Sequence, residues 1–461
     1  MQTSTRLGTK AWGAVLLTSI ATLTPLRAET EVELLRKSIA ELEQRLKVIE
    51  RKQELDKESA DAAAKTQPVV KVDSSGFGVE SKDKAWGLKI RGNIQLDGRF
   101  YLDDGGVNNN DRFLFRRIRP SLEGTVGKSF TFRIMPDFAP ATFELLDAYG
   151  NYKFSDGFNL LFGRTKSPAG LERLISQTNL PFIERGYPTS ILPNRDTGIQ
   201  LHGKLFNGTL NWNLSALNGT TDGQSSPATQ LDDDIEFAGR LFANPFINED
   251  GSVLQRLGAG VSVTYGNQEN TAPAGYRTTG QQTSFSWLSD VKVDGEVFRV
   301  SPQAYYYYGP FGFLAEYAVS QQRLVNPTAK AQDSLVNTAW QAYASWVLTG
   351  EDASYEGVKP AEPFSIADGK WGAFEVVARV GQLEIDKDAF ALDAAKKPTL
   401  FADPAKSARS VTGATLGLNW YLTRNAKFVV NYDWNQFDGG AAGGKDKIDE
   451  KAIFTRLQLN F

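Results

Sequence analysis

Residues 88–100 read LKIRGNIQLDGRF, and this stretch decides the class of fold. Every even position holds an apolar residue or glycine, and every odd position holds a polar or charged residue. Successive side chains of a β-strand point to opposite faces, so a period of two predicts a strand with one apolar face and one wet face.

The same alternation recurs almost to the end of the chain. Counting clear and weaker examples together gives 16 expected strands, at 88–100, 118–126, 130–138, 146–154, 158–162, 199–205, 210–216, 235–243, 257–265, 300–308, 311–319, 340–348, 374–380, 414–422, 428–434 and 453–461. A chain with this pattern is expected to be an all-β transmembrane barrel of 16 antiparallel strands.

The lengths of the connections support this expectation. Most odd-numbered connections are long (102–111, 167–195, 219–234, 266–297), whereas most even-numbered ones are short (127–128, 155–157, 206–209, 309–310). Long loops at one rim and short turns at the other are typical of outer-membrane barrels, whose strand number is usually even. Three connections depart from the rule: 139–145 is unexpectedly short, and 244–256 and 349–373 are unexpectedly long.

The chemistry of the two faces indicates which one meets lipid. The face with Leu88, Ile90 and Ile94 carries no charge, whereas the opposite face carries Lys89 and Arg91. A charge on the lipid face near the membrane midplane costs about 2–4 kcal/mol, so we expect the charged face to line the lumen. The alternative is a water-soluble β-sandwich, but aromatic residues near many strand ends suit interfacial girdles better.

The first 86 residues do not show this alternation. Residues 1–28 resemble a signal peptide, with basic Arg6 and Lys10, an apolar stretch, and a small residue, Ala28, before the expected cleavage site. Residues 29–57 carry apolar residues at heptad spacing and are expected to form a short coiled-coil oligomerisation segment, although a lone amphipathic helix is the alternative. Residues 58–86 are then a flexible periplasmic linker, and residues 87–461 form the barrel domain.

Composition excludes several classes of function. The chain has 461 residues, no cysteine, one histidine (His202) and a formal net charge of −3. No disulfide framework, thiolate metal site or cysteine nucleophile is possible, and no cofactor is expected. A lone histidine with no Gly-x-Ser-x-Gly elbow argues against an enzyme, and the negative charge argues against a nucleic-acid partner.

Six motifs resemble the phosphate-selective porin O/P family: RRIR at 116–119, GRTKSP at 163–168 followed by GLE at 170–172, PQAYYYYGPFG at 302–312, LTGE at 348–351, WGAFE at 371–375 and GLNWY at 417–421. They fall in the family's order and cover about residues 87–461. The resemblance implies a homotrimer of 16-stranded barrels in the bacterial outer membrane, each with an anion-selective pore narrowed by inward-folded loops.

The lumen charge follows from strand parity alone. Thirteen cations are expected to face inward, namely Lys89, Arg91, Arg99, Arg117, Arg119, Arg133, Lys153, Lys204, Arg240, Arg299, Arg379, Lys427 and Arg456. Eight acids are expected to face them, namely Asp97, Glu123, Asp137, Asp147, Glu236, Glu316, Glu375 and Asp433. A positive excess between low-dielectric walls favours anion flux, unless the cations simply pair with the acids and leave a weakly selective pore.

Lys166, at the start of the third long loop, is the first candidate for the constriction. Arg117 and Arg119 share one strand face, and the expected anion pathway further includes Arg91, Lys89, Arg99, Arg133 and Arg379, with Arg164 and Arg173 as weaker candidates. The sequence therefore predicts passive diffusion of small anions, such as phosphate or polyphosphate, through a barrel surrounded by outer-membrane lipid. The alternatives are a weakly selective general porin, and a structural tether that acts through the periplasmic coiled coil.

Overall fold

The computed structural model describes residues 27–461 except residues 75, 103–109, 141–142, 228–232 and 392–400. The signal peptide expected at residues 1–28 therefore lies almost wholly outside the described residues. The chain divides into two compact units, Met1–Gln67 and Pro68–Phe461.

The first unit contains one long helix, α1 (Arg27–Thr66). It extends nine residues beyond the expected end of the coiled coil and stops two residues before Pro68, consistent with the steric restriction that a proline places on the residue before it. Its heptad positions are all more than half exposed, at Val32, Leu35, Ile39, Leu42, Leu46 and Ile49. In the described part of the chain, no helix combines the length and the hydropathy needed to cross a membrane.

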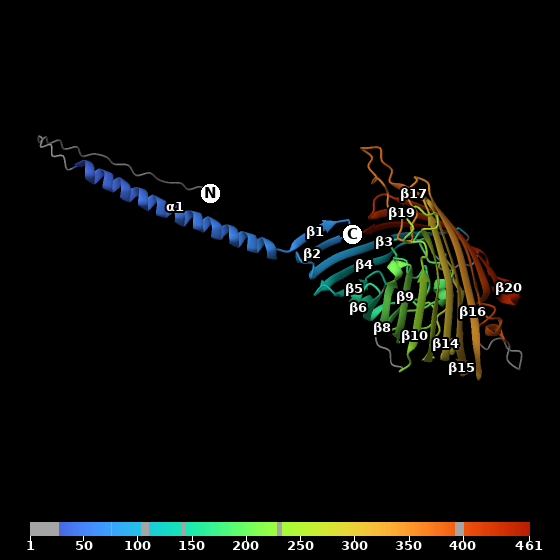
Figure 1. Ribbon diagram of the computed structural model, residues 1–461. Coiled ribbons are helices and arrows are strands. Elements are labelled where there is room, and N and C mark those ends of the chain that lie inside the picture. Colours follow the sequence, from blue (N-terminus) through green and yellow to red (C-terminus); the bar gives the residue numbers. More distant parts are fainter. Residues whose placement is uncertain (1–26, 75, 103–109, 141–142, 228–232, 392–400) are drawn as a thin grey trace, which may run out of the picture. The chain divides into compact units, whose positions relative to one another are not determined.

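The second unit is a closed antiparallel barrel, whose strands are labelled in Figure 1. Its 16 wall strands are β3 (Trp86–Tyr101), β4 (Arg112–Val126), β5 (Phe130–Asp137), β6 (Glu144–Ser155), β7 (Phe158–Lys166), β8 (Arg195–Leu205), β9 (Leu210–Leu217), β10 (Glu236–Ala243), β11 (Arg256–Thr271), β14 (Lys292–Tyr308), β15 (Phe311–Asn326), β16 (Ala331–Val347), β17 (Ala373–Glu384), β18 (Ala408–Tyr421), β19 (Ala426–Ala441) and β21 (Glu450–Asn460).

Each wall strand pairs with the next wall strand in the chain, and β21 pairs with β3 to close the barrel, from Ala452 opposite Tyr101 to Asn460 opposite Asn93. The prediction of a 16-stranded antiparallel barrel is confirmed. The chain alternates between a rim of short turns, where β3 begins and β21 ends, and a rim of long loops.

Burial follows the predicted parity. Along β3, Leu88 and Ile90 are 46% and 48% exposed on the outside, whereas Gln95 and Asp97 are fully buried on the inside. The inward side chains of the wall are mostly polar and hydrogen-bond to one another and to inserted loops, and apolar clusters form where inserted segments pack against the wall.

Residues 58–86 differ from the expected flexible linker. After the end of α1, they form a hairpin of β1 (Val69–Asp73) and β2 (Gly76–Glu80), and β2 pairs with the first half of β3. The segments VVKVD and GFGVE do alternate with a period of two, as strands should. The prediction missed them because each strand has only five residues and the surrounding residues are polar.

Several connections fold into the barrel. The inner loop (residues 167–194) joins β7 to β8, contains the short helix α2 (Pro188–Ile191), and packs Leu171, Ile175, Leu180 and Phe182 against the wall. From the long-loop rim, segments with β12 (Tyr276–Arg277), β13 (Thr283–Phe285) and η2 (Lys387–Phe390) join an apolar cluster around Tyr276, Phe285, Phe401 and Val411. The remaining short elements are η1 (Phe206–Gly208), η3 (Ala442–Gly444) and β20 (Lys445–Asp446).

The unexpectedly long short-rim connection, residues 348–372, also turns inward. Its Ala353 and Val358 pack with Tyr307, Val347 and Tyr421 of the wall. Its Tyr355 donates a 2.8 Å hydrogen bond to the carbonyl oxygen of Leu171 in the inner loop. Inserted segments from both rims therefore meet inside the barrel.

Candidate functional site

The inner loop is held in the lumen by wall side chains that bind its backbone. Lys427 Nζ lies 2.8 Å from Leu180 O, Arg456 Nη1 lies 2.8 Å from Ile183 O, and Arg379 Nη1 lies 3.0 Å from Glu184 O. Arg379 also lies 3.5 Å from the Glu172 carboxylate. These three inward cations thus fix the position of the loop; the sequence predicted Lys427 and Arg456 as lumen charges and Arg379 as part of the anion pathway.

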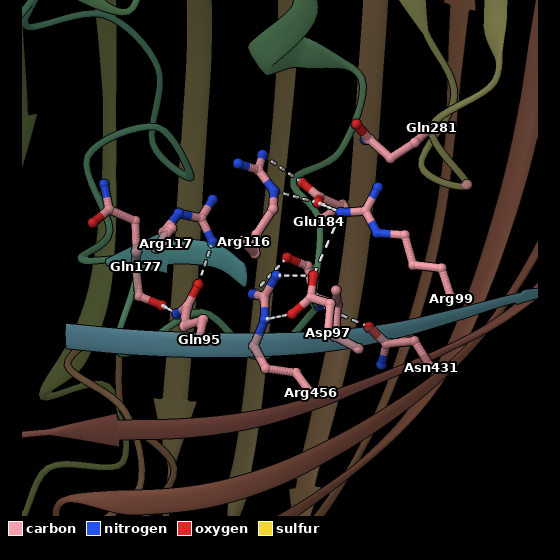
Figure 2. A network of polar contacts seen from close by, with 12 residues as sticks. Gln95, Asp97, Arg99, Arg116, Arg117, Gln177, Glu184, Gln281, Asn431 and Arg456 are labelled. Carbon is pink, nitrogen blue, oxygen red and sulfur yellow. Dashed lines mark hydrogen bonds and ion pairs between the residues drawn. The ribbon is translucent and has the colours of Figure 1, made fainter. Parts of the chain in front are cut away.

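Glu184, near the middle of the inner loop, lies between two wall arginines (Figure 2). Its Oε1 accepts from Arg99 Nη2 at 2.7 Å and from Arg116 Nε at 2.8 Å. Burial alone raises the pKa of Glu184, but the charges of Arg116 and Arg99 outweigh burial and hold its pKa well below its usual range. Glu184 is therefore a permanent anion among the arginines.

Arg116 points inward because β4 contains a bulge. Gln95 of β3 pairs with Arg117, but the next residue, Leu96, pairs with Phe115, so Arg116 has no partner in the ladder. Both arginines consequently face the lumen. Strict alternation along the strand would point Arg116 toward lipid, so the sequence did not identify it as a pathway residue. Because a charged side chain facing lipid is energetically costly, an arginine at an outward position was the signal that could have identified the bulge.

Arg117 has no carboxylate partner within the described structure. Its Nη1 donates to Gln95 Oε1 at 2.6 Å, an amide contact also visible in Figure 2. Arg173 and Arg185 of the inner loop are similar, because their described partners are backbone carbonyls of residues 172, 175, 189 and 192. Burial lowers the pKa of both Arg173 and Arg185, to about 9 and about 10, so both remain charged near neutral pH.

These arginines line a cavity of about 540 Å³ on the long-loop side of the inner loop. Its charged lining consists of five cations and two acids, namely Arg116, Arg117, Arg173, Arg185, Arg277, Glu184 and Asp222. Arg117 and Arg173 were candidates from the sequence, whereas Arg185 was missed because it lies in a loop where strand parity gives no direction.

Lys166, the first candidate for the constriction, is at the end of β7. Its Nζ donates to Leu174 O at 3.1 Å and to Ile175 O at 3.0 Å, so it also ties the inner loop to the wall. It lines a second cavity of about 490 Å³ toward the short-turn rim, with Lys153, Lys204, Arg240 and a single acid, Asp156.

The other candidates fall into two groups. Arg119 is paired with Asp137 at 2.6 Å, and Arg164 donates to Leu145 O and Ser226 Oγ, so both serve local structure. Lys89, Arg91 and Arg133 line a third cavity, of about 440 Å³, whose other charged residues are Lys71, Asp73, Glu80 and Glu123. Arg91 and Arg133 each lie 3.6 Å from Glu123. The predicted pathway cations therefore differ in their partners. Arg91, Arg119 and Arg133 lie beside carboxylates. Arg117 and Arg173 have no carboxylate partner in the described structure.

Guanidinium and ammonium groups gathered around these cavities are suited to attracting small anions. Within the described residues, no group of three or more His, Asp or Glu side chains could hold a metal ion. The inner loop contributes Arg173, Glu184 and Arg185 to the long-loop cavity and Lys166's partner Leu174 to the short-turn cavity. It therefore lies between two cavities in whose linings the cations outnumber the acids.

Comparisons with known proteins agree with this geometry. The sequence model of the family described as phosphate-selective porin O and P matches residues 88–461. The outer membrane channel DcaP of Acinetobacter baumannii is 14% identical, with a TM-score of 0.52, over 84% of this chain and 100% of that chain. Identity this low shows a shared fold alone.

Two further structures match at lower similarity. The anion-selective porin from Comamonas acidovorans is 10% identical over 82% of this chain and 100% of that chain, with a TM-score of 0.48. OmpT of Vibrio cholerae, in a trimer form, is 10% identical over the same shares of the two chains, with a TM-score of 0.49. A comparison with curated proteins found no significant match.

Proposed function

This chain belongs to the phosphate-selective porin O and P family and is an outer-membrane porin, and we propose that it conducts small anions, phosphate among them, by passive diffusion through a positively charged lumen. In this proposal the long-loop rim is extracellular and the short-turn rim, with α1, is periplasmic.

The observation that carries the proposal is the charge lining on both sides of the inner loop. Five cations face two acids in the long-loop cavity, and four cations face one acid in the short-turn cavity. Excess charge of one sign between low-dielectric walls raises the local concentration of the opposite ion. Anions are therefore favoured over cations along this path.

The buried carboxylates do not cancel this excess where ions would pass. Glu316 accepts from the backbone N–H groups of Leu171 and Glu172, Glu375 accepts from Asn419 and Tyr421, and Glu450 accepts from Thr278 and Asn435. None of these three lines any of the three cavities. Counting inward charges by parity alone therefore understates the positive character of the pathway.

The residue types suit phosphate. Guanidinium forks bind phosphate oxygens bidentately, and several shallow sites in series allow an anion to pass without being trapped. The guanidinium groups of Arg117 and Arg173 line the long-loop cavity, and neither has a carboxylate partner in the described structure. These are the donors that we assign to a passing phosphate.

Planar-bilayer recording of the purified full chain tests the proposal. We expect anion over cation preference in a salt gradient, and block of chloride current by millimolar phosphate. Cation preference at neutral pH would contradict the anion pore, and anion preference without phosphate block would indicate a general anion porin.

We further propose that the porin is a homotrimer held partly by α1, because its exposed heptad positions require partner helices. The same observation favours a second role as a tether to the cell wall. Deleting residues 29–57 separates the two: a tether loses cell-wall association with unchanged conductance, whereas an assembly segment loses triplet conductance steps.

A further inference from the structure

We propose that the outer face of the β1–β2 hairpin and the start of β3 packs against a second copy of this chain around the axis of the oligomer. This inference rests on the assembly proposed above and not on the selectivity of the pore. It assigns an interface role to a segment that the sequence predicts to be a flexible linker.

The face consists of two apolar rows that cross three strands. The ladders place Val70 opposite Val79 and Val79 opposite Leu88, and they place Val72 opposite Phe77 and Phe77 opposite Ile90. All six side chains are 46–69% exposed in the single chain. Phe461, at the end of the chain, packs edge-on against Phe77 with ring centroids 5.9 Å apart and enlarges the patch.

The hairpin is a defined part of the wall. β2 pairs with residues 87–90 of β3, and β21 pairs with the same edge of β3 from residue 93 onward. The inner face of the hairpin carries Lys71 and Glu80, paired at 2.7 Å, so polar and apolar sides match those of the barrel. At the turn, Gly76 has φ +123°, and a Cβ there would lie 2.4 Å from Ile90 O. This glycine lets the hairpin lie close to β3.

The free edge of β1 requires cover. No described strand pairs with its second edge, and Ser74, which follows β1, accepts a 2.7 Å hydrogen bond from Asn425 Nδ2. An open sheet edge is not tolerated in hydrocarbon, and in water it invites pairing with another chain. Lipid therefore fits the apolar face but not the adjoining edge, whereas protein fits both.

The covalent connection to α1 identifies that protein as another copy. Only Gln67 and Pro68 separate the end of α1 from the start of β1. With helices packed about 10 Å apart and a link of this length, β1 starts within about 20 Å of the axis of any bundle that α1 forms. A barrel of this strand number is about 30 Å across, so its opposite wall cannot reach the axis.

Cross-linking of single-cysteine variants tests the proposal, because the native chain has no cysteine. Val72→Cys on β1 and Ile90→Cys on the rigid wall are treated in membranes with a bismaleimide whose flexible spacer can span about 35 Å, the separation of two equivalent sites that lie about 20 Å from a three-fold axis. The matched control is Val261→Cys on β11, which is 39% exposed on the opposite wall. We expect covalent dimers from the first two variants and none from the control.

Each other outcome contradicts the proposal. Dimers from Val72→Cys without dimers from Ile90→Cys would mean that helices gather the hairpins without packing this face. Equal dimers from Val261→Cys, or none from any variant in an intact oligomer, would place the interface elsewhere. As a second variant with all barrel strands unchanged, Gly76→Val should dislodge the hairpin and cause loss of the Ile90→Cys dimers. A pore that proves cation-selective leaves all of these readouts unaffected, so the two proposals fail separately.

Discussion

The Nε of Arg116 lies 2.8 Å from Oε1 of Glu184, and this contact exists because β4 contains one residue more than β3 can pair. The bulge turns Arg116 from the lipid side to the lumen, where it meets the inner loop together with Arg99. A local irregularity in the strand ladder thereby adds one contact to the inner loop and one positive charge to the long-loop cavity.

Replacing Glu184 with Gln should increase anion preference. The variant keeps the shape of the side chain but removes one negative charge between Arg99 and Arg116, 2.7 and 2.8 Å away. One unit charge at contact distance is worth about 1 kcal/mol in a water-like dielectric, or about fivefold in the anion-to-cation permeability ratio. The reversal potential in a salt gradient measures it. The exposed Glu249→Gln is the matched control, and an equal shift in that variant would mean that Glu184 does not act on the pathway.

The selectivity of the native pore should not change with the titration of Glu184 between about pH 4 and pH 8, a window that includes the ordinary glutamate pKa of about 4.3. Because its pKa is held well below its usual range, its ion pairs are fully formed above the ordinary carboxyl pKa and are lost only as pH falls through the lower folded-state value. Reversal potentials recorded across that window check this. A step near the ordinary carboxyl pKa that disappears in Glu184→Gln would show that the arginines do not stabilise the carboxylate.

Arg117→Gln should mainly change selectivity and Arg119→Gln should mainly change stability, although both arginines lie on the inner face of β4. Arg117 has an amide partner and lines the long-loop cavity, so its loss should reduce anion preference and weaken phosphate block with little loss of stability. Arg119 is paired at 2.6 Å with buried Asp137, so its loss should cost about 3–5 kcal/mol of stability. Reversal potentials and the heat resistance of the folded barrel on gels separate the two. Equal loss of selectivity in both variants would contradict the distinction between paired and unpaired cations.

Strand parity predicted the wall strands well because every strand of a membrane barrel has one face toward lipid and the other toward the lumen, and so shows the same alternation. All 16 segments, including the weaker one at 158–162, form wall strands. The same rule failed at Arg116, because a bulge shifts parity by one residue and leaves no unambiguous mark in a single sequence.

The site was less predictable than the fold. Parity gives the direction of a side chain but not its partner, so it could not show that Arg379 and Lys427 bind loop carbonyls. Arg185 has no strand to orient it. The hairpin of residues 69–80 was missed because two five-residue strands carry too little pattern to stand out from polar surroundings.

Lys166→Met should loosen the inner loop and reduce anion preference together. The ammonium group binds the carbonyl oxygens of Leu174 and Ile175 and adds a positive charge to the short-turn cavity, whereas methionine keeps only the length of the side chain. We expect noisier open-channel current and a lower anion-to-cation permeability ratio. Lys204→Met, in the same cavity but with no hydrogen bond to the inner loop in the described structure, is the control and should lower the ratio without added noise. Unchanged current noise in Lys166→Met would show that Lys166 does not anchor the inner loop.

Tyr355→Phe should affect gating without affecting selectivity. The Tyr355 hydroxyl donates a 2.8 Å hydrogen bond to Leu171 O, which joins residues 348–372 to the inner loop, and it carries no charge at neutral pH. Loss of one such bond costs about 0.5–1.5 kcal/mol, so the open state should fluctuate more while the reversal potential stays the same. Tyr306→Phe, whose hydroxyl binds Val253 O outside the lumen, is the matched control. Equal noise in the two variants, or a shifted reversal potential in Tyr355→Phe, would show that contact between the inserted segments does not stabilise the pore.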